Sequence, residues 1–286
     1  MPGKLLICPT PLGNLGDVTL RSLDALRSAD TVCAEDTRVT GKLLAALDIE
    51  GKHLERLDEN VIASRCDAIL DRVQQGENIA YCTDAGMPGV SDPGMRLVQA
   101  AREKGVPVEV LPGPTAAATA YVASGCNSST FYFGGFFPRK DAARQQLLES
   151  LKALEAALIF YESPNRLVGA LQSIKDTLPS RPVAVCRELT KLHEEIARGT
   201  AAMLLADFES RDAVKGEIVI VIDAPTKEER AEDACDAADS ARERAVQLSV
   251  AGERPKSIAK TIAAEFGIPR NEAYEIALSA RDESAQ

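Results

Sequence analysis

The chain has 286 residues, of which 45% are hydrophobic, and a formal net charge of −10. This length and apolar content allow two domains with packed cores, and the negative charge excludes nucleic-acid binding by bulk electrostatics, so that an RNA contact needs a local basic patch. Seven Cys without a CxxC clip and only two His argue against disulfides and against a metal site. We expect no signal peptide and no membrane span, and therefore a cytoplasmic protein.

The first third of the chain alternates apolar runs with helical patterns. A short buried strand is predicted at residues 4–8, followed by a Gly/Pro loop over 9–17 that lacks the GxGxxG fingerprint of dinucleotide sites. A second strand at 31–34 ends in four polar residues, Glu35 to Arg38, which are costly there unless they are solvated or used. Helices are predicted at 19–29, 41–47 and 62–75.

Two further loops rich in Gly and Pro follow predicted strands. Strand 79–82 leads into a loop that reaches Gly94, and strand 108–111 leads into Pro112–Thr115 and an Ala-rich helix. Open α/β sheets bind ligands outside the carboxyl ends of their strands, so three such loops predict one small-molecule site. Ordinary surface turns remain the alternative for each loop, and tight helix–sheet packing remains the alternative for the alanines.

The second half has a different rhythm, with a boundary near Asn127. We predict strands at 131–137, 158–161, 183–186 and 218–222. Helices are predicted at 142–153 and 201–208, and a third helix follows Arg166 and ends near residue 176. Charged residues follow the strands: Glu162, Arg166, Arg187, Glu188 and Lys191. The expected fold is α/β, with two α/β domains (1–127 and 128–224) that form a cleft between them.

The tail, 225–286, is expected to be a linker and a small helical domain. Residues 225–239 read as a linker or an exposed helix, and 255–280 read as two helices around Gly267-Ile268-Pro269, similar to a helix-turn-helix. A helical hairpin that packs on the body is the alternative. Residues 227–286 hold 13 acidic and 9 basic side chains, which argues against unaided phosphate binding.

Seven blocks occur in an order and spacing that resemble a known family: CPTPLGNLGD, AEDTR, YCTDAGMPGVSDPG, LPGPTAAATA, FFPRK, FYESPNR and CRELTKLHEE. The chain resembles the ribosomal RNA small-subunit methyltransferase I family, within the tetrapyrrole methylase superfamily. The resemblance implies S-adenosylmethionine as methyl donor and 2′-O-methylation of a cytidine ribose in the decoding region of 16S rRNA, within the 30S subunit. It also implies a cytoplasmic homodimer with the donor in the interdomain cleft.

The same resemblance implies a set of donor-binding residues in this chain: Pro11, Asp84, Ala85, Gly86, Val90, Thr115, Ala116, Glu162 and Leu189. Two positions depart from the family pattern. Asn165 occupies a place where many members of the RNA branch have His, so we assign it no catalytic role, and Met87 occupies a place where Thr is common.

Methyl transfer to a hydroxyl depends mainly on positioning, and a base helps because a ribose hydroxyl is a poor acid. We assign the catalytic role to Glu35, Asp36 and Glu162, with Asp84 and Glu188 as further candidates; helix capping and ion pairing with Arg are the alternatives for each. RNA phosphates are expected to meet a set of basic side chains at the mouth of the cleft: Arg38, Lys42, Arg139, Lys140, Arg144 and Arg166.

Two other functions remain open. The superfamily fold also serves methylases of corrin or sirohaem precursors, and fold does not determine function. The AEDTR, FFPRK and YESPNR blocks favour the RNA branch. A non-catalytic ribosome-binding protein that uses its helical tail is the alternative from another class.

Overall fold

The computed structural model describes residues 3–284, and the side chains of all of these except 232–234 and 282–284. The last two residues of the expected tail domain therefore lie outside the described residues. The chain divides into two compact units, one up to Ala224 and one from Pro225. Each unit is described by itself below.

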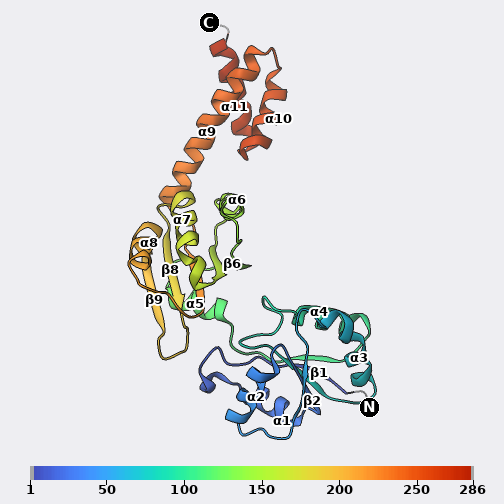
Figure 1. Cartoon of the computed structure of the whole chain (residues 1–286). Helices are drawn as coiled ribbons and strands as arrows, with labels where there is room; N and C mark the ends of the chain where they lie inside the picture. Colours follow the sequence, from blue (N-terminus) through green and yellow to red (C-terminus); the bar gives the residue numbers. More distant parts are fainter. Residues whose placement is uncertain (1–2, 285–286) are drawn as a thin grey trace. The chain divides into compact units, whose positions relative to one another are not determined.

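The first unit begins with a fully parallel five-stranded sheet (Figure 1). Its order is β3-β2-β4-β1-β5, with bounds Leu5–Ile7 for β1, Thr31–Ala34 for β2, His53–Arg56 for β3, Ile79–Cys82 for β4 and Val108–Val110 for β5. Alternate residues of the central strands enter two separate cores: Leu5 and Ile7 pack with α3 (Ile62–Gln74) and α4 (Gly94–Glu103), whereas Leu6 packs with α1 (Leu20–Ser28) and α2 (Thr37–Ala46). Burial on both faces explains the continuous apolar runs in the sequence.

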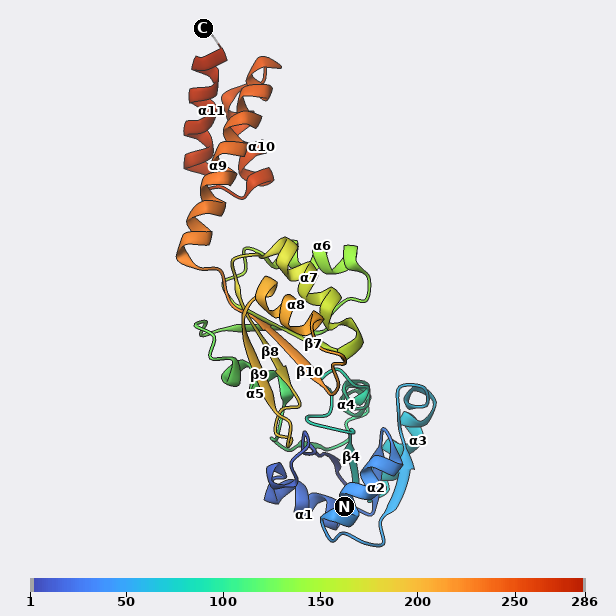
Figure 2. The ribbon, with the colours of Figure 1, turned by 60° about the vertical axis from the view of Figure 1, so that its left-hand side comes forward.

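A second five-stranded sheet completes this unit (Figure 2). Its order is β6-β7-β10-β8-β9, in which only β6 and β7 are parallel. The strands are β6 (Phe131–Phe136), β7 (Ala157–Glu162), β8 (Pro182–Arg187), β9 (Glu195–Thr200) and β10 (Ile218–Ile222). One face is covered by α6 (Asp141–Leu151), α7 (Leu167–Thr177) and α8 (Ala201–Glu209).

Helix α5 (Ala116–Ser124) covers the other face of the second sheet. It follows β5 of the first sheet, but Ala117 and Ala120 pack against Ala157, Ala184 and Val219 of the second sheet. Small side chains allow this close approach. Ala117 and Ala120 therefore serve helix–sheet packing, and Ala116, which packs at the edge of the same cluster, also lines the cavity described below.

The second unit consists of three helices: α9 (Lys227–Val250), α10 (Pro255–Phe266) and α11 (Arg270–Ser284). Residues 227–250 are helical, so the exposed-helix alternative describes this stretch and the linker does not. Ile258 and Ile262 of α10 pack with Ala245 of α9 and Ile276 of α11 in a core of their own. Gly267, with φ +67°, ends α10 in the left-handed region, as expected for a helix C-terminus.

The α/β fold class is confirmed, and two strands were missed. β3 (sequence HLER) and β9 (sequence EIARGT) lie at sheet edges, and alternate residues of β9 are exposed. Neither strand contains an apolar run. Edge strands are only partly buried and can carry polar residues, so the search for apolar runs did not detect β3 and β9. No helix of the described part is long and apolar enough to cross a membrane. All seven Cys are free, and only Cys235 is exposed.

Candidate functional site

Three loops meet at the carboxyl ends of β1, β4 and β5. The loop after β1 pairs with the loop after β4, because Thr10 N–H donates to the Gly86 carbonyl at 3.0 Å and Gly86 N–H donates back to Thr10 at 3.0 Å. The loop after β5 packs on the first one so closely that a Cβ on Gly113 would fall 2.3 Å from Cγ of Pro9. Glycine at 113 is therefore required by contact with Pro9.

The loop after β4 holds a strained shape through one carboxylate. Gly86 (φ +82°), Gly89 (φ +92°) and Ser91 (φ +68°) all adopt left-handed backbone conformations, which is unusual for the serine. The Asp92 carboxylate accepts hydrogen bonds from the backbone N–H groups of Gly89, at 2.8 Å, Val90, at 3.1 Å, and Gly94, at 2.8 Å. Asp92 thus acts as the internal brace of this loop.

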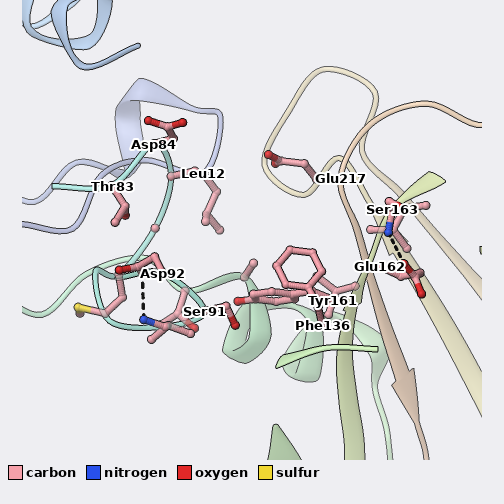
Figure 3. A pocket seen from close by; sticks show the side chains of 18 of the residues that line it. Leu12, Thr83, Asp84, Ser91, Asp92, Phe136, Tyr161, Glu162, Ser163 and Glu217 are labelled. Atoms are coloured by element: carbon pink, nitrogen blue, oxygen red, sulfur yellow. Dashed lines mark hydrogen bonds between the residues drawn. The ribbon is translucent and has the colours of Figure 1, made fainter. Parts of the chain in front are cut away.

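These loops form one wall of a cavity of about 490 Å³, and its other wall comes from the second sheet. Figure 3 shows Leu12, Thr83 and Asp84 on one side and Phe136, Tyr161 and Glu217 on the other. The volume falls within the range of small-molecule sites. The full lining is Leu12, Glu35, 83–87, 90–92, Thr115, Ala116, Phe136, 161–164 and 216–219.

The cavity is acidic. Five carboxylates line it, Glu35, Asp84, Asp92, Glu162 and Glu217, and among the described residues that line it there is no Lys, Arg or His. Burial is the first cause that raises the pKa of Glu35, and the charge of Asp84 raises it further. Burial likewise raises the pKa of Asp84, and the nearby charge of Asp36 adds to this. The site therefore favours a cation, or protons on these two groups.

Two buried polar atoms of the lining lack a hydrogen-bond partner within the described structure: the Thr83 hydroxyl and Oε2 of Glu162. Thr83 and Glu162 are each only 3% exposed. An unsatisfied buried acceptor or donor costs about 1–3 kcal/mol. Both atoms are consistent with a polar ligand that satisfies them.

Most residues that the resemblance assigned to donor binding line this one cavity: Asp84, Ala85, Gly86, Val90, Thr115, Ala116 and Glu162. Pro11 and Leu189 do not line it. Pro11 is buried beside Leu12, which lines the cavity instead. Leu189, 7% exposed, packs under α5 in the core of the second sheet.

The expected catalytic carboxylates differ in their surroundings. Glu35 lines the cavity, whereas Asp36 does not: it caps α2 by accepting from the Arg38 N–H at 2.8 Å and pairs with the Arg38 guanidinium at 2.6 Å. These bonds lower the pKa of Asp36 well below its ordinary value, which disfavours Asp36 as a base, and its catalytic role stays a prediction. Glu162 lines the cavity but pairs with Arg166 at 2.5 Å through Oε1.

The remaining candidate base, Glu188, is also occupied. Its Oε1 accepts from Lys191 Nζ at 2.8 Å and from the Glu217 backbone N–H at 3.0 Å. These bonds lower the pKa of Glu188. Of the five carboxylates considered from the sequence, only Glu35 and Asp84 both line the cavity and lack an ion pair in the described part of the chain.

The basic residues expected to hold RNA fall into three groups. Arg144 is 3% exposed, and its guanidinium donates to Ser173 and to the carbonyls of Pro138, Arg139 and Gly169, which disfavours a contact of this side chain with RNA. Two others are engaged with carboxylates: Arg166 with Glu162, and the exposed Arg38 with Asp36. Exposed side chains remain at Lys42, Arg139 and Lys140.

Several lining residues were not predicted: Leu12, Thr83, Met87, Ser91, Asp92, Phe136, Tyr161, Ser163, Pro164 and 216–219. Phe136 and Tyr161 end predicted strands, so strand ends carried a signal for them. Gly216 to Val219 lie at the start of β10. They reach the site because β10 runs antiparallel to β7, a direction that the apolar run alone does not reveal.

Sequence comparison places the chain in a known family. The family of Tetrapyrrole (Corrin/Porphyrin) Methylases matches residues 4–205. A ribosomal RNA small subunit methyltransferase I from Micromonospora olivasterospora is 39% identical over 274 residues, which cover 96% of this chain and 86% of that protein. The chain belongs to this methyltransferase I family of tetrapyrrole methylases.

Two further comparisons bear on the architecture of this methylase. The ribosomal RNA small subunit methyltransferase I of Thermotoga maritima is 41% identical over 220 residues, which make up 98% of that protein but only 77% of this chain. A crystal structure of diphthine synthase has the same fold, with a TM-score of 0.62 at 14% identity, over 78% of this chain and 91% of the other. The likeness in structure extends to the fold alone.

Proposed function

We propose that the chain transfers a methyl group from S-adenosylmethionine to the 2′-hydroxyl of a cytidine in the decoding region of 16S rRNA, acting on the 30S subunit as a cytoplasmic homodimer. The observation that carries the proposal is the acidic cavity between the two sheets in a member of this family. The names of the relatives supply the substrate class, ribosomal RNA of the small subunit.

The cavity suits a sulfonium nucleoside on three counts. Its carboxylates favour a positive charge. Its apolar side chains, among them Leu12, Val90 and Ile218, suit the uncharged parts of such a ligand. The Thr83 hydroxyl and the free oxygen of Glu162 are available for its polar groups. The bound donor would supply a methyl group already activated by the positive sulfur.

The residues of the chain would act mainly by positioning. The loop braced by Asp92 and the first turn of α5 present Asp84, Ala85 and Thr115 on one side of the cavity. Tyr161 and Phe136 pack edge to face at 5.6 Å between ring centroids on the other side. Rigid walls of this kind hold two reactants in line, which accounts for much of the rate in a displacement.

Glu35 and Asp84 are the groups that would accept the proton of the ribose hydroxyl. Both pKa values are raised, and a base whose pKa lies nearer the working pH is more effective. Asp84 Oδ1 accepts from the Asp36 N–H at 3.1 Å, which fixes its orientation. We expect Asp84→Asn and Glu35→Gln each to reduce methyl transfer by about 10²–10⁴-fold if that group is the base.

The test uses purified chain, donor with a labelled methyl group, and 30S subunits from cells that lack this modification. Transfer of one label to a cytidine 2′-oxygen, located by mass mapping of nuclease fragments, is the expected result. Label on a base or on no RNA would overturn the proposal. A tetrapyrrole precursor incubated in parallel tests the second enzyme function, and calorimetry with the donor tests the non-catalytic alternative, which requires the absence of donor binding.

A further inference from the structure

The charge of the second unit is distributed unevenly along the chain. Residues 254–270 contain four basic side chains, Arg254, Lys256, Lys260 and Arg270, and one acidic side chain, Glu265. The stretch before it, 227–253, contains eight acidic and four basic residues, and 271–284 contains four acidic and one basic. The unit as a whole is negative, but residues 254–270 have a net positive charge. We call the four basic side chains of this segment the α10 basic face.

These four cations are exposed and available. Helix α10 buries Ile258, Ala259 and Ile262, so Lys256 and Lys260, four residues apart, share its exposed side. Arg254 immediately precedes the helix, and Arg270 begins α11. None of the four forms an ion pair within the part of the chain that the structure describes, whereas Glu265 pairs with Arg244 at 3.3 Å.

An exposed aromatic ring follows this segment closely in the sequence. Only Gly267, Ile268 and Pro269 separate α10 from α11, so the first turn of α11 follows directly. Tyr274, in the second turn of α11, is 40% exposed. Cations that meet phosphates, together with an aromatic ring on which a base stacks, are the combination that binds RNA with unpaired bases.

Of the basic residues expected to hold RNA in the first unit, Lys42, Arg139 and Lys140 remain exposed, and the other three are buried or paired. The cavity of this unit is lined by carboxylates. The Thermotoga maritima relative matches only 77% of this chain, and the unmatched part is about the size of the second unit. A methyltransferase I of this family can therefore be shorter than this chain by about the size of the three helices.

We propose that the α10 basic face binds backbone phosphates of the RNA substrate, with Tyr274 stacked on an unpaired base beside them. This inference rests on the proposed function for the identity of the RNA, and on charge complementarity for the surface. Helix α10 has 12 residues and is thus about 18 Å long, enough to follow several phosphates of one strand.

The test compares two double variants of the full chain that remove the same charge from the same unit. Lys256→Gln/Lys260→Gln should weaken binding to 30S subunits and to a protein-free fragment of the decoding region by about tenfold at moderate salt. The salt slope of binding should fall by about 1.4–1.8, because two phosphate contacts are lost. The matched control, Lys227→Gln/Arg242→Gln, lies on α9 and should stay within about twofold of the unchanged chain.

Tyr274 supplies a second, independent measurement. Tyr274→Ala should weaken binding to the RNA fragment by at least about fivefold, and Tyr274→Phe should restore it, because the ring and not the hydroxyl stacks. Calorimetry with the donor should show no change in any of these variants, since none of the residues lines the cavity.

The inference is overturned if the α10 variant matches the control, or if its loss of affinity appears on 30S subunits but not on protein-free RNA, which would identify a ribosomal protein as the partner. These readouts measure RNA binding and not methyl transfer. Failure of the proposed reaction would appear separately, as an unchanged chain that binds RNA without methylating it.

Discussion

At the scale of single residues, two carboxylates at the end of the first sheet that are candidates for the reaction, Glu35 and Asp84, reduce the stability of the fold when they are charged. Glu35 and Asp84 follow the neighbouring strands β2 and β4. Burial raises the pKa of both carboxyl groups; the charge of Asp84 also raises the pKa of Glu35, and the charge of Asp36 raises that of Asp84. A raised carboxyl pKa means that folding favours the protonated form. The stabilisation that it brings is complete below the ordinary Glu value of 4.5 and is lost as the pH rises through the raised value.

Glu35→Gln should therefore be more stable than the unchanged chain at neutral pH, by about 0.5–1 kcal/mol, a figure kept small because Glu35 is only partly buried and solvent screens it. The gain should disappear as the pH falls below about 4.5, where the native Glu35 is itself protonated. Thermal unfolding at a series of pH values measures this. Asp36→Asn is the control of opposite sign, because Arg38 lowers the pKa of Asp36 and removal of that charge should reduce stability at neutral pH. Parallel pH curves for the Gln variant and the unchanged chain would contradict the expectation.

Asp92 shows how one side chain shapes a binding loop. Its carboxylate satisfies three backbone N–H groups in a loop with three left-handed residues. Asp92→Ala should destabilise the first unit by about 2–3 kcal/mol, since hydrogen bonds to a charged group are worth about 1.5–3 kcal/mol.

The same variant should weaken donor binding by at least about tenfold, because the loop positions Asp84 and Val90 in the cavity. Calorimetry with S-adenosylmethionine measures the affinity, and thermal unfolding measures the stability. Asp92→Asn retains one acceptor oxygen and should give an intermediate result. Donor affinity in the Ala variant equal to that of the unchanged chain would show that the loop keeps its shape without the brace.

At the scale of elements, glycine in a strand and glycine in a helix have opposite consequences here. A Cβ on Gly134 of β6 would fall 2.3 Å from Cε1 of Phe160, a buried ring of β7. A Cβ on Gly41 of α2 would meet only Leu54 Cδ1, at an ordinary 3.5 Å. The first glycine is required by packing, and the second only weakens its helix.

Gly134→Ala should therefore reduce the free energy of unfolding by about 1–3 kcal/mol, whereas Gly41→Ala should increase it by about 0.5–1 kcal/mol. Urea denaturation of the two variants measures both changes under the same conditions. Losses of similar size in both would mean that the packing difference between the two sites does not determine their stability.

The elements also show what the sequence could and could not predict. Central strands such as β10, with the sequence IVIVI, are buried on both faces and carry a clear apolar signal. β3 and β9 are edge strands whose partners, β2 and β8, determine their pairing. Three loops were predicted to share a site because they follow strands, and residues from all three line one cavity. The contribution of β10 was missed because strand direction depends on chain topology.

At the scale of the whole molecule, each unit has a core of its own, and no core cluster of the described residues contains members of both. A chain that ends at Ala224 should therefore fold, bind S-adenosylmethionine with unchanged affinity, and lose at least about tenfold in affinity for 30S subunits if the second unit grips RNA. Calorimetry and a filter-binding assay measure the two affinities. Loss of donor binding in this shorter chain would contradict the independence of the two units.

The distribution of thiols has a practical consequence. Burial raises the pKa of Cys33, Cys82 and Cys186 to about 12, which suppresses their reactivity towards alkylating reagents, whereas Cys235 on α9 is exposed. A maleimide dye should attach at this position in the native protein without mutagenesis. Fluorescence from that dye would then report, in real time, when a ribosomal particle arrives near the three-helix module.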